Sequence, residues 1–232
     1  MADEPRTPGK KKAVKHKRTA RDPSQQVKSA KGRKNSSTAW LKRQLNDPYV
    51  REAERLGYRS RAAFKLLELN EKLNFLRSDT LVIDLGSAPG GWTQVAQQKG
   101  AQVIALDLLP MDPVPETTFI QMDFSDDDAP DKLLAAMNGR QADAVLSDIA
   151  PNTTGHKATD HLRIIALAEM AYDFAAQVLA PGGTFVCKVF QGGAQDSLLK
   201  QLKADFKTVK HIKPPASRKD SSELYVVGLG FK

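Results

Sequence analysis

The segment Leu81–Trp92, with the sequence LVIDLGSAPGGW, constrains the fold more than any other part of the chain. It begins with a short apolar run that ends in Asp84, which is typical of a buried parallel strand. Four Gly or Pro residues within 86–91 then interrupt the pattern before the helix-compatible sequence WTQVAQQ. A strand, a glycine-rich turn and a helix in this order form a cradle for a cofactor, because the helix N-terminus points beyond the carboxyl end of the strand. The alternative is a turn that only lets the helix pack closely on the sheet.

Strand and helix signals alternate from residue 81 onward, which predicts an α/β fold: a mostly parallel seven-stranded sheet with helices on both faces. The expected strands are Thr80–Leu85, Gln102–Asp107, Thr118–Met122, Asp143–Ser147, Gly183–Phe190, Thr208–Ile212 and Glu223–Gly230. The main expected helices are Pro48–Leu56, Arg61–Leu76 (with Ser60 as its N-cap), His161–Leu179 and Gln195–Phe206. Only a short polar stretch separates the last two strands, so we expect them to be antiparallel neighbours, with one strand reversed.

The positive charge of the chain is concentrated in its first 37 residues. This segment holds 12 Lys or Arg and 3 Asp or Glu, whereas the remaining 195 residues carry 23 basic and 24 acidic side chains. So polar a segment cannot bury enough apolar surface to offset its ordering entropy. We therefore expect a disordered basic tail at 1–37 and a folded domain at 38–232. Such tails commonly bind phosphate backbones, although a solubilising extension without a specific partner has the same composition.

Composition also indicates the compartment. Cys187 is the single cysteine, which excludes an intrachain disulfide framework and fits a reducing environment. No run approaches the roughly 18 consecutive apolar residues of a transmembrane helix, and the N-terminus lacks the apolar stretch of a secretory signal. Asp3, Glu4 and the preference for lysine over arginine count against a mitochondrial transit peptide. We expect a cytoplasmic protein with no membrane partner.

Three acidic residues follow predicted strands, at the edge where an open α/β sheet binds its ligand. Asp107 ends QVIALD, Asp123 follows FIQM and Asp148 follows AVLS. Asp107 lies 23 residues after Asp84, where an acidic side chain can accept hydrogen bonds from ribose hydroxyls. Asp123 is placed to meet an adenine amino group. Each aspartate alone can equally belong to a turn or a helix cap, but three of them favour a nucleoside-containing cofactor.

Lys188 stands in the apolar strand GTFVCKVF, where alternation places it on the face opposite Cys187. Burying an unpaired ammonium costs several kcal/mol, so either the lysine reaches solvent along its stem or a carboxylate such as Asp148 holds it in a cleft. A partly desolvated lysine can serve as a base. Cys187 is expected to be a small core residue. Taken by themselves, Lys65 and Glu223 are expected to be solvated surface residues.

Together these segments resemble the FtsJ/RlmE family, the 2′-O-methyltransferases of large-subunit ribosomal RNA. The pattern D-x-G-x-x-P-G-G at 84–91 looks like the first motif of S-adenosylmethionine-dependent methyltransferases, and it differs from the G-x-G-x-x-G of dinucleotide-binding folds. The other matching stretches are SRAAFKL at 60–66, ALDLLPMDP at 105–113, SDIAPN at 147–152, LAPGG at 179–183, FVCKVFQG at 185–192 and SRKDSSELYVV at 217–227. The resemblance runs from about Trp40 to the C-terminus.

The resemblance implies a Rossmann-like S-adenosylmethionine-dependent methyltransferase fold. It also implies methylation of a ribose 2′-hydroxyl, in the first place of a uridine in 23S ribosomal RNA during late assembly of the large subunit, by a monomer. The family's Lys-Asp-Lys-Glu tetrad falls on Lys65, Asp148, Lys188 and Glu223, with Lys188 as the base or orienting group. Its cofactor-binding residues fall on Gly90, Trp92, Asp107, Asp123 and Asp148, and no metal is implied.

Three other functions remain open at this point. The tetrad serves 2′-O-methyltransferases of transfer RNA and of other RNAs as well. A non-catalytic RNA-binding factor in ribosome assembly can keep the same fold. A nicotinamide-dependent oxidoreductase is the most distant of the three. An assay of methyl transfer and a test of S-adenosylmethionine binding separate these alternatives.

Overall fold

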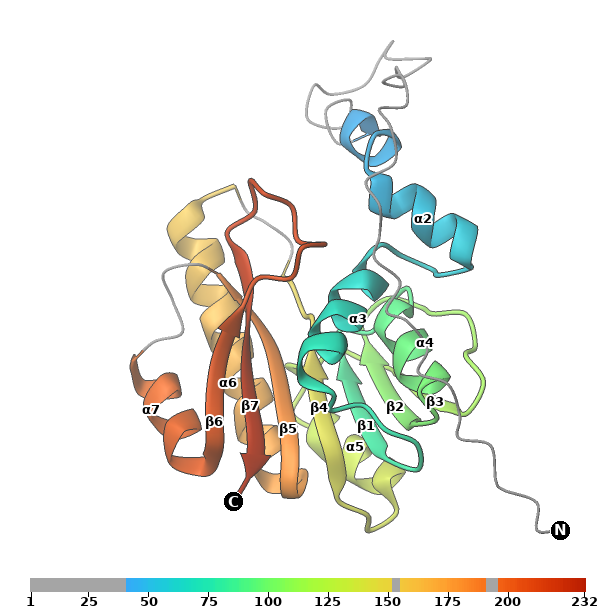
Figure 1. Cartoon of the computed structure of the whole chain (residues 1–232). Helices are drawn as coiled ribbons and strands as arrows, with labels where there is room; N and C mark the ends of the chain where they lie inside the picture. The colour runs from blue at the N-terminus through green and yellow to red at the C-terminus, as the bar shows by residue number, and fades with distance from the viewer. Residues whose placement is uncertain (1–40, 152–154, 191–195) are drawn as a thin grey trace, which may run out of the picture. The chain divides into compact units, whose positions relative to one another are not determined.

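The structure of the protein is a computed structural model, and it describes residues 41–151, 155–190 and 196–232 (Figure 1). The chain divides into two compact units, Met1–Asn46 and Asp47–Lys232. In the first unit, residues 41–45 are helical, and the amide of Asn46 donates a hydrogen bond to the carbonyl of Lys42 at 2.7 Å. The predicted basic tail at 1–37 lies outside the described residues.

The second unit is built on a seven-stranded sheet with the strand order β3-β2-β1-β4-β5-β7-β6. The strands are β1 (Leu81–Leu85), β2 (Gln102–Asp107), β3 (Thr117–Gln121), β4 (Ala142–Ser147), β5 (Leu179–Phe190), β6 (Phe206–Ile212) and β7 (Glu223–Phe231). All neighbours are parallel except β5–β7 and β6–β7, so β7 is the one reversed strand. The predicted Rossmann-like sheet and its single antiparallel strand are confirmed.

Helices cover both faces of the sheet (Figure 1). The helices of the second unit are α2 (Pro48–Leu56), α3 (Ala62–Leu73), α4 (Gly91–Gln98), α5 (Ala129–Met137), α6 (Lys157–Val178) and α7 (Asp196–Asp205). Strand β1 is buried on both sides: Ile83 belongs to the core under α5, α6 and α7, and Val82 to the core under α3 and α4. None of the described helices is long and apolar enough to cross a membrane.

The helix that carries Lys65 differs from the prediction at both ends. Ser60 does not cap α3: the N-cap position is Arg61, and no side chain caps the first turn through a hydrogen bond. The helix ends at Leu73 rather than at residue 76. Asn74 adopts a left-handed conformation there, and the side chain of Asn70 accepts hydrogen bonds from the N–H groups of residues 75 and 76 at 3.0 and 2.8 Å. A side-chain cap thus replaces the last helical turn.

Strand β5 begins four residues before its predicted start at Gly183. The sequence Pro181-Gly182 indicates a turn, and Gly182 does have a left-handed φ of 87°. Leu179 nevertheless pairs with Ala142 of β4, and the register shifts before Thr184 pairs with Ala144. The strand therefore continues through an irregularity that local sequence signals read as a boundary.

Candidate active site

The glycine-rich segment after β1 forms a tight turn at the carboxyl edge of the sheet. The N–H of Gly86 donates to the carbonyl of Leu106 on β2 at 2.9 Å, and its φ of 77° is left-handed. A Cβ at Gly86 would lie 2.8 Å from Ile149, so only glycine allows this approach. Gly90, at φ 105°, stands at the N-cap of α4, which has no side-chain cap. The backbone N–H groups that begin α4 therefore remain for a ligand.

Asp107, at the end of β2, ties two loops together. Its Oδ2 accepts a hydrogen bond from the N–H of Ala88 in the glycine turn, and its Oδ1 accepts one from the N–H of Leu109, both at 2.8 Å. Asp123, after β3, instead accepts from the N–H and the hydroxyl of Ser125 at 2.9 and 2.7 Å. These hydrogen bonds lower the pKa of Asp123. Both carboxyl groups thus lie at the carboxyl edge of the sheet, where α/β folds bind their ligands.

Trp92 is a packing residue as well as part of the predicted site. Its indole N–H donates to the carbonyl of Ala62 at 2.9 Å, and its ring centroid lies 5.5 Å from that of Tyr225. The side chain is buried, in the core that α3 and α4 cover. The indole therefore fixes α4, and with it the glycine turn, against α3 and β7.

Three buried polar atoms beside the glycine turn have no hydrogen-bond partner within the described part of the chain: Asp84 Oδ1, Ser87 Oγ and Ser60 Oγ, which lies against Gly91. The other oxygen of Asp84 accepts a hydrogen bond from Thr93 at 2.6 Å. Burial raises the pKa of Asp84 to about 7, although the hydrogen bond from Thr93 lowers it. Unsatisfied buried polar groups are rare and call for a reason. A polar ligand at the turn supplies one.

The structure brings the four predicted tetrad residues together from four elements. Lys188, on β5, lies with its Nζ 3.1 Å from Asp148 Oδ1 and 2.5 Å from the Asp148 carbonyl oxygen. Lys65, on α3, lies 2.7 Å from Glu223 Oε1 and 3.9 Å from Asp148 Oδ2. Each lysine residue is only 7% exposed. Lys188 is therefore paired with a carboxylate in a buried position, and its side chain does not reach out to solvent.

Asp148 is the charged centre of this cluster. Burial opposes its ionisation, but the positive charges of Lys188 and Lys65 and the hydroxyl of Tyr225 outweigh that effect, so the pKa of Asp148 lies below its ordinary value. Its backbone N–H donates to the carbonyl of Leu85 on β1 at 3.1 Å, which fixes it at the end of β4. The carboxylate is therefore ionised and rigidly placed between two lysines.

Sequence reasoning missed Tyr225 as a site residue. Its hydroxyl donates to Asp148 Oδ1 at 2.7 Å, and the Lys65 ammonium lies 5.7 Å from its ring centroid. Burial and the negative charge of Asp148 raise the pKa of Tyr225 well above its ordinary value, so it remains a donor. The signal was available, since alternation along β7 puts Tyr225 on the same face as Glu223.

Ser217 was also missed. It lies in the connection between β6 and β7, and its hydroxyl donates to Glu223 Oε1 at 3.0 Å. Cys187, in contrast, is the core residue that the pattern predicts. It packs under α6 and α7, and burial raises the pKa of its thiol to about 12, so it supplies no thiolate.

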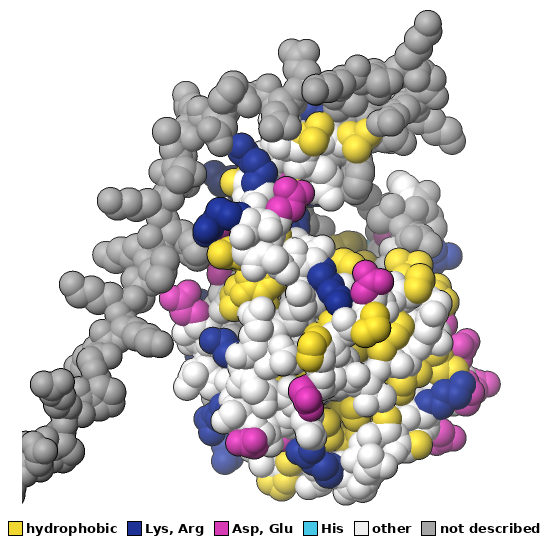
Figure 2. Space-filling view, turned by 90° about the vertical axis from the view of Figure 1, so that its right-hand side faces the viewer, with side chains coloured by type: hydrophobic (Ala, Val, Ile, Leu, Met, Phe, Trp, Pro, Cys, Tyr) yellow, Lys and Arg dark blue, Asp and Glu magenta, His cyan; other side chains and the backbone are white. Residues whose placement is uncertain are grey.

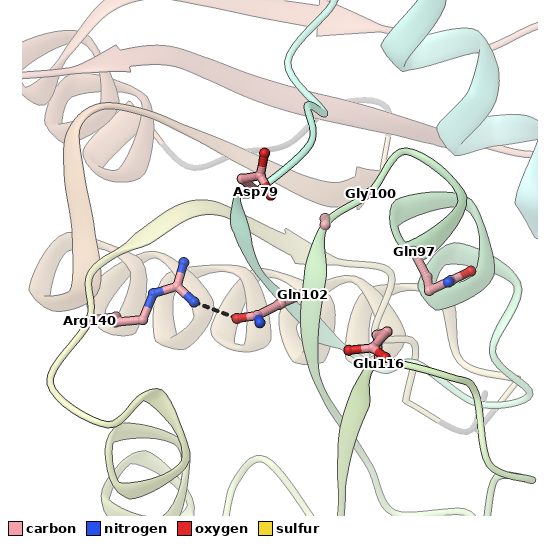
Figure 3. Close-up of a pocket in the computed structure, with 7 residues that line it drawn as sticks. Asp79, Gln97, Gly100, Gln102, Glu116 and Arg140 are labelled. Atoms are coloured by element: carbon pink, nitrogen blue, oxygen red, sulfur yellow. Dashed lines mark hydrogen bonds between the residues drawn. The ribbon is translucent and has the colours of Figure 1, made fainter.

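A separate pocket of about 400 Å³ lies at the amino edge of the sheet, away from the tetrad (Figure 3). It is lined by Asp79, Gln97, Gly100, Ala101, Gln102, Glu116 and Arg140. Arg140 is the one basic residue among these lining residues, and its guanidinium donates a hydrogen bond to Gln102 Oε1. This cation therefore already has a partner. Within the described residues, no group of His, Cys, Asp and Glu side chains is arranged to bind a metal ion.

Comparison with known proteins identifies the family of this chain. A family model described as FtsJ-like methyltransferase matches residues 58–231. The ribosomal RNA large subunit methyltransferase E of Paramagnetospirillum magneticum is 59% identical over 214 residues, which cover 89% of this chain and 87% of the relative. The protein of the same name from Azorhizobium caulinodans is 55% identical over 238 residues, covering 100% of this chain and 95% of the relative.

Solved structures show the same fold. A Plasmodium falciparum protein described as a ribosomal RNA methyltransferase is 33% identical, with a TM-score of 0.67 over 75% of this chain and 98% of that chain. A hemolysin-like protein from Streptococcus thermophilus, 18% identical, shares the fold with a TM-score of 0.53 over 75% of this chain and 67% of that chain. The family indicated by the sequence motifs is therefore confirmed: the chain belongs to the FtsJ-like methyltransferase family.

Proposed function

We propose that the protein transfers the methyl group of S-adenosylmethionine to a ribose 2′-hydroxyl of large-subunit ribosomal RNA. The observation that carries the proposal is the buried Lys65–Asp148–Lys188–Glu223 cluster beside the glycine turn. The relatives named ribosomal RNA large subunit methyltransferase E support ribosomal RNA as the substrate. Following the resemblance, the target is a uridine of 23S ribosomal RNA that is modified late in assembly of the subunit.

The residues at the carboxyl edge fit S-adenosylmethionine. Asp107 suits ribose hydroxyls and Asp123 an adenine amino group, while Gly90 lets the ligand approach the start of α4. The backbone at Trp92, two residues after Gly90, and the carboxylate of Asp148 complete the set of residues that would hold the cofactor. The partnerless oxygens of Asp84 and Ser87 support a polar ligand here. When bound, this cofactor supplies an already activated methyl group.

The protein's own residues then align the acceptor and handle its proton. These residues would hold the acceptor hydroxyl in line with the methyl group that the cofactor supplies, and Lys188, in its neutral amine form, would take the hydroxyl proton as the new carbon–oxygen bond forms. Asp148 orients that amine through the 3.1 Å contact. Lys65, held by Glu223, adds positive charge that favours alkoxide character in the acceptor. A hydroxyl that DNA lacks makes RNA the substrate.

The test is a methyl-transfer assay with radiolabelled S-adenosylmethionine and three substrates: large subunits from cells lacking this protein, their naked ribosomal RNA, and transfer RNA. We expect label in the large-subunit RNA, at a uridine whose 3′ phosphodiester resists alkaline hydrolysis. An otherwise identical RNA with a 2′-deoxynucleotide at the mapped position is the control, and it should accept no label. Label on a base, or binding of RNA without any transfer, would contradict the proposal.

The basic segment 1–37 is proposed to add affinity for the RNA. On the described face shown in Figure 2, acidic and basic side chains are scattered among apolar ones, so positive charge is not gathered there. The segment's 12 basic residues are the strongest attraction for phosphate in the chain. Deleting residues 1–36 should weaken RNA binding and flatten its salt dependence, and an unchanged slope would return the segment to a solubilising role.

We also propose that the protein acts in the cytoplasm as a monomer. One chain supplies the whole tetrad, so the site needs no residue from a second copy. The buried single cysteine fits a reducing compartment. Sedimentation of the purified protein at micromolar concentration tests the oligomeric state, with a single species of the chain's 25.4 kDa expected.

A further inference from the structure

The connection between β6 and β7, residues 213–222, is braced internally. Lys213 Nζ donates to the carbonyls of Lys219 and Ser221 at 3.2 and 2.6 Å. The N–H of Ser217 donates to the carbonyl of Pro214 at 2.8 Å. These bonds hold both arms of the loop together, so its geometry does not depend on a ligand.

Hydrogen bonds also hold this loop against α3 and against Arg61, the residue that precedes α3. The N–H of Ala216 donates to Glu68 Oε2 at 2.7 Å, and the carbonyl of Ala216 accepts from Arg61 Nη2 at 2.6 Å. Ala216 is fully buried, so both halves of its backbone are satisfied by charged side chains. Lys65 is on α3 between Arg61 and Glu68. The hydrogen bonds that these two residues make to Ala216 therefore also fix the position of the loop relative to Lys65.

Ser217, directly after Ala216, reaches the tetrad. Its hydroxyl donates to Glu223 Oε1 at 3.0 Å, and the same oxygen lies 2.7 Å from Lys65 Nζ. Ser217 is buried, so this hydrogen bond does not compete with bulk water. The backbone N–H of Glu223 in turn donates to the hydroxyl of Ser221 at 3.1 Å. Two serines of one loop therefore fix the carboxylate and the backbone of Glu223.

Lys65 has a second carboxylate within reach, since its Nζ lies 3.9 Å from Asp148 Oδ2. What keeps the ammonium nearer to Glu223 is the fixed place of Oε1. If that oxygen moves, the positive charge of Lys65 moves toward Asp148. The Asp148 carboxylate would then be shared between the Lys188 ammonium and a Lys65 ammonium that lies closer to it than before.

We infer that Ser217 is a positioning residue, which holds the Glu223 carboxylate and through it sets the distance of the Lys65 charge from the Asp148–Lys188 pair. This inference rests on the proposed methyl transfer. Ser217 touches neither substrate nor cofactor, and its effect passes through Glu223 and Lys65. Arg61 and Glu68 help to position Ser217 through their hydrogen bonds to the backbone of Ala216, the preceding residue.

The kinetic test compares Ser217→Ala with Ser217→Thr, which keeps a hydroxyl. The control is Ser222→Ala, which removes an exposed serine from the same loop. Ser217→Ala should lower kcat about ten-fold, as expected for one hydrogen bond to a charged group. Its KM for RNA and its dissociation constant for S-adenosylmethionine should stay near the wild-type values. Ser217→Thr should restore most of kcat, and Ser222→Ala should match the wild type.

A crystal structure of Ser217→Ala tests the positioning itself, without activity. We expect the Glu223 carboxylate to turn away from Lys65, beyond the roughly 4 Å limit of an ion pair. A Lys65–Glu223 contact that is unchanged, or equal kcat values for Ser217→Ala and Ser222→Ala, would overturn the inference. If the wild-type protein transfers no methyl group to RNA, the proposed function fails, and the crystal structure still decides whether Ser217 holds Glu223.

Discussion

The hydroxyl of Tyr225 donates a hydrogen bond to Asp148 Oδ1 at 2.7 Å. The same carboxylate oxygen is the one that the Lys188 ammonium approaches, at 3.1 Å. Tyr225 lies directly opposite Lys188 in the antiparallel pairing of β5 and β7, so the sheet register delivers both donors to one oxygen. Asp148 thereby keeps its charge in a buried site.

Replacing Tyr225 by Phe should raise the pKa of the Asp148 carboxyl. The hydroxyl donates to Asp148 Oδ1 and helps to lower that pKa, so its loss raises it. Isotope-edited NMR titration of the Asp148 carboxyl carbon measures the change. Tyr58→Phe is the control, because that hydroxyl contacts Gln98 at 3.0 Å, away from the tetrad. An Asp148 pKa that moves equally in both variants, or in neither, would contradict this role.

Gly90→Ala should weaken binding of S-adenosylmethionine by about ten-fold or more. A Cβ at Gly90 would lie 2.8 Å from Arg59 Nη1, whose guanidinium donates to the carbonyl of Asp112 at 2.6 Å. Moving Arg59 aside would disturb the β2–β3 loop next to the glycine turn. Calorimetric titration measures the effect.

Gly57→Ala is the matched control for this variant. Gly57 also has a left-handed φ, of 76°, but nothing lies within 4 Å of its Cβ position. Gly57→Ala should lose about 1 kcal/mol of unfolding free energy from backbone strain, Gly90→Ala should lose more, and only Gly90→Ala should lose cofactor affinity. Equal cofactor affinity in the two variants would contradict the role of the turn.

Asp84→Asn should stabilise the protein at pH 8 more than at pH 5. In the folded state burial raises the pKa of Asp84 to about 7, well above its ordinary value of 3.8. The folded protein therefore holds a proton that the unfolded chain releases, so this group's contribution to stability is present below about pH 4 and is lost as the pH rises to about 7. Asparagine does not ionise, so the variant avoids this pH-dependent loss of unfolding free energy, which amounts to a few kcal/mol.

Urea unfolding of the wild type and of Asp84→Asn at both pH values checks this prediction. The quantity of interest is the difference in unfolding free energy between the two proteins, because other groups titrate equally in both. The difference should favour the variant increasingly from pH 5 to pH 8. A difference that does not depend on pH would show that Asp84 is not held protonated.

Asp107→Asn should lower the affinity for S-adenosylmethionine by about 10- to 100-fold. Both carboxylate oxygens accept backbone N–H groups, so an amide N–H₂ would face a donor and loosen one of the two loops. Asp79→Asn makes the same chemical change in the pocket at the opposite edge, at a left-handed residue where Asn is well tolerated. It should bind the cofactor like the wild type, and a comparable loss there would argue against a local effect.

The central strands β1, β2, β4 and β5 were largely predictable because each contains a buried apolar run. The differences arise where a tertiary contact overrides the local signal. Asn70 ends α3 early through its side chain, and pairing with β4 carries β5 back to Leu179 through Pro181 and Gly182. The local sequence at the end of α3 and at the start of β5 does not reveal either contact.

The candidate site divides in the same way. Lys188 and Asp148 stand out because a lysine in an apolar strand needs a carboxylate nearby. Lys65 and Glu223 carry no such signal, since only the packing of α3 on the sheet brings them within 2.7 Å, and the family resemblance alone pointed to them. Tyr225 is masked by the apolar character of its strand, although its spacing from Glu223 places it on the site's face.

The most direct test of this account is single-turnover methyl transfer to large-subunit RNA by Lys188→Ala, with the dissociation constant for S-adenosylmethionine measured on the same preparation. The control is Lys132→Ala, because Lys132 forms an exposed ion pair with Asp128 on the far side of the sheet from α3. We predict that Lys188→Ala loses transfer by about 1,000-fold or more while its cofactor affinity stays within about two-fold of the wild type. Turnover close to that of Lys132→Ala would contradict the assignment of Lys188 as the group that takes the 2′-hydroxyl proton.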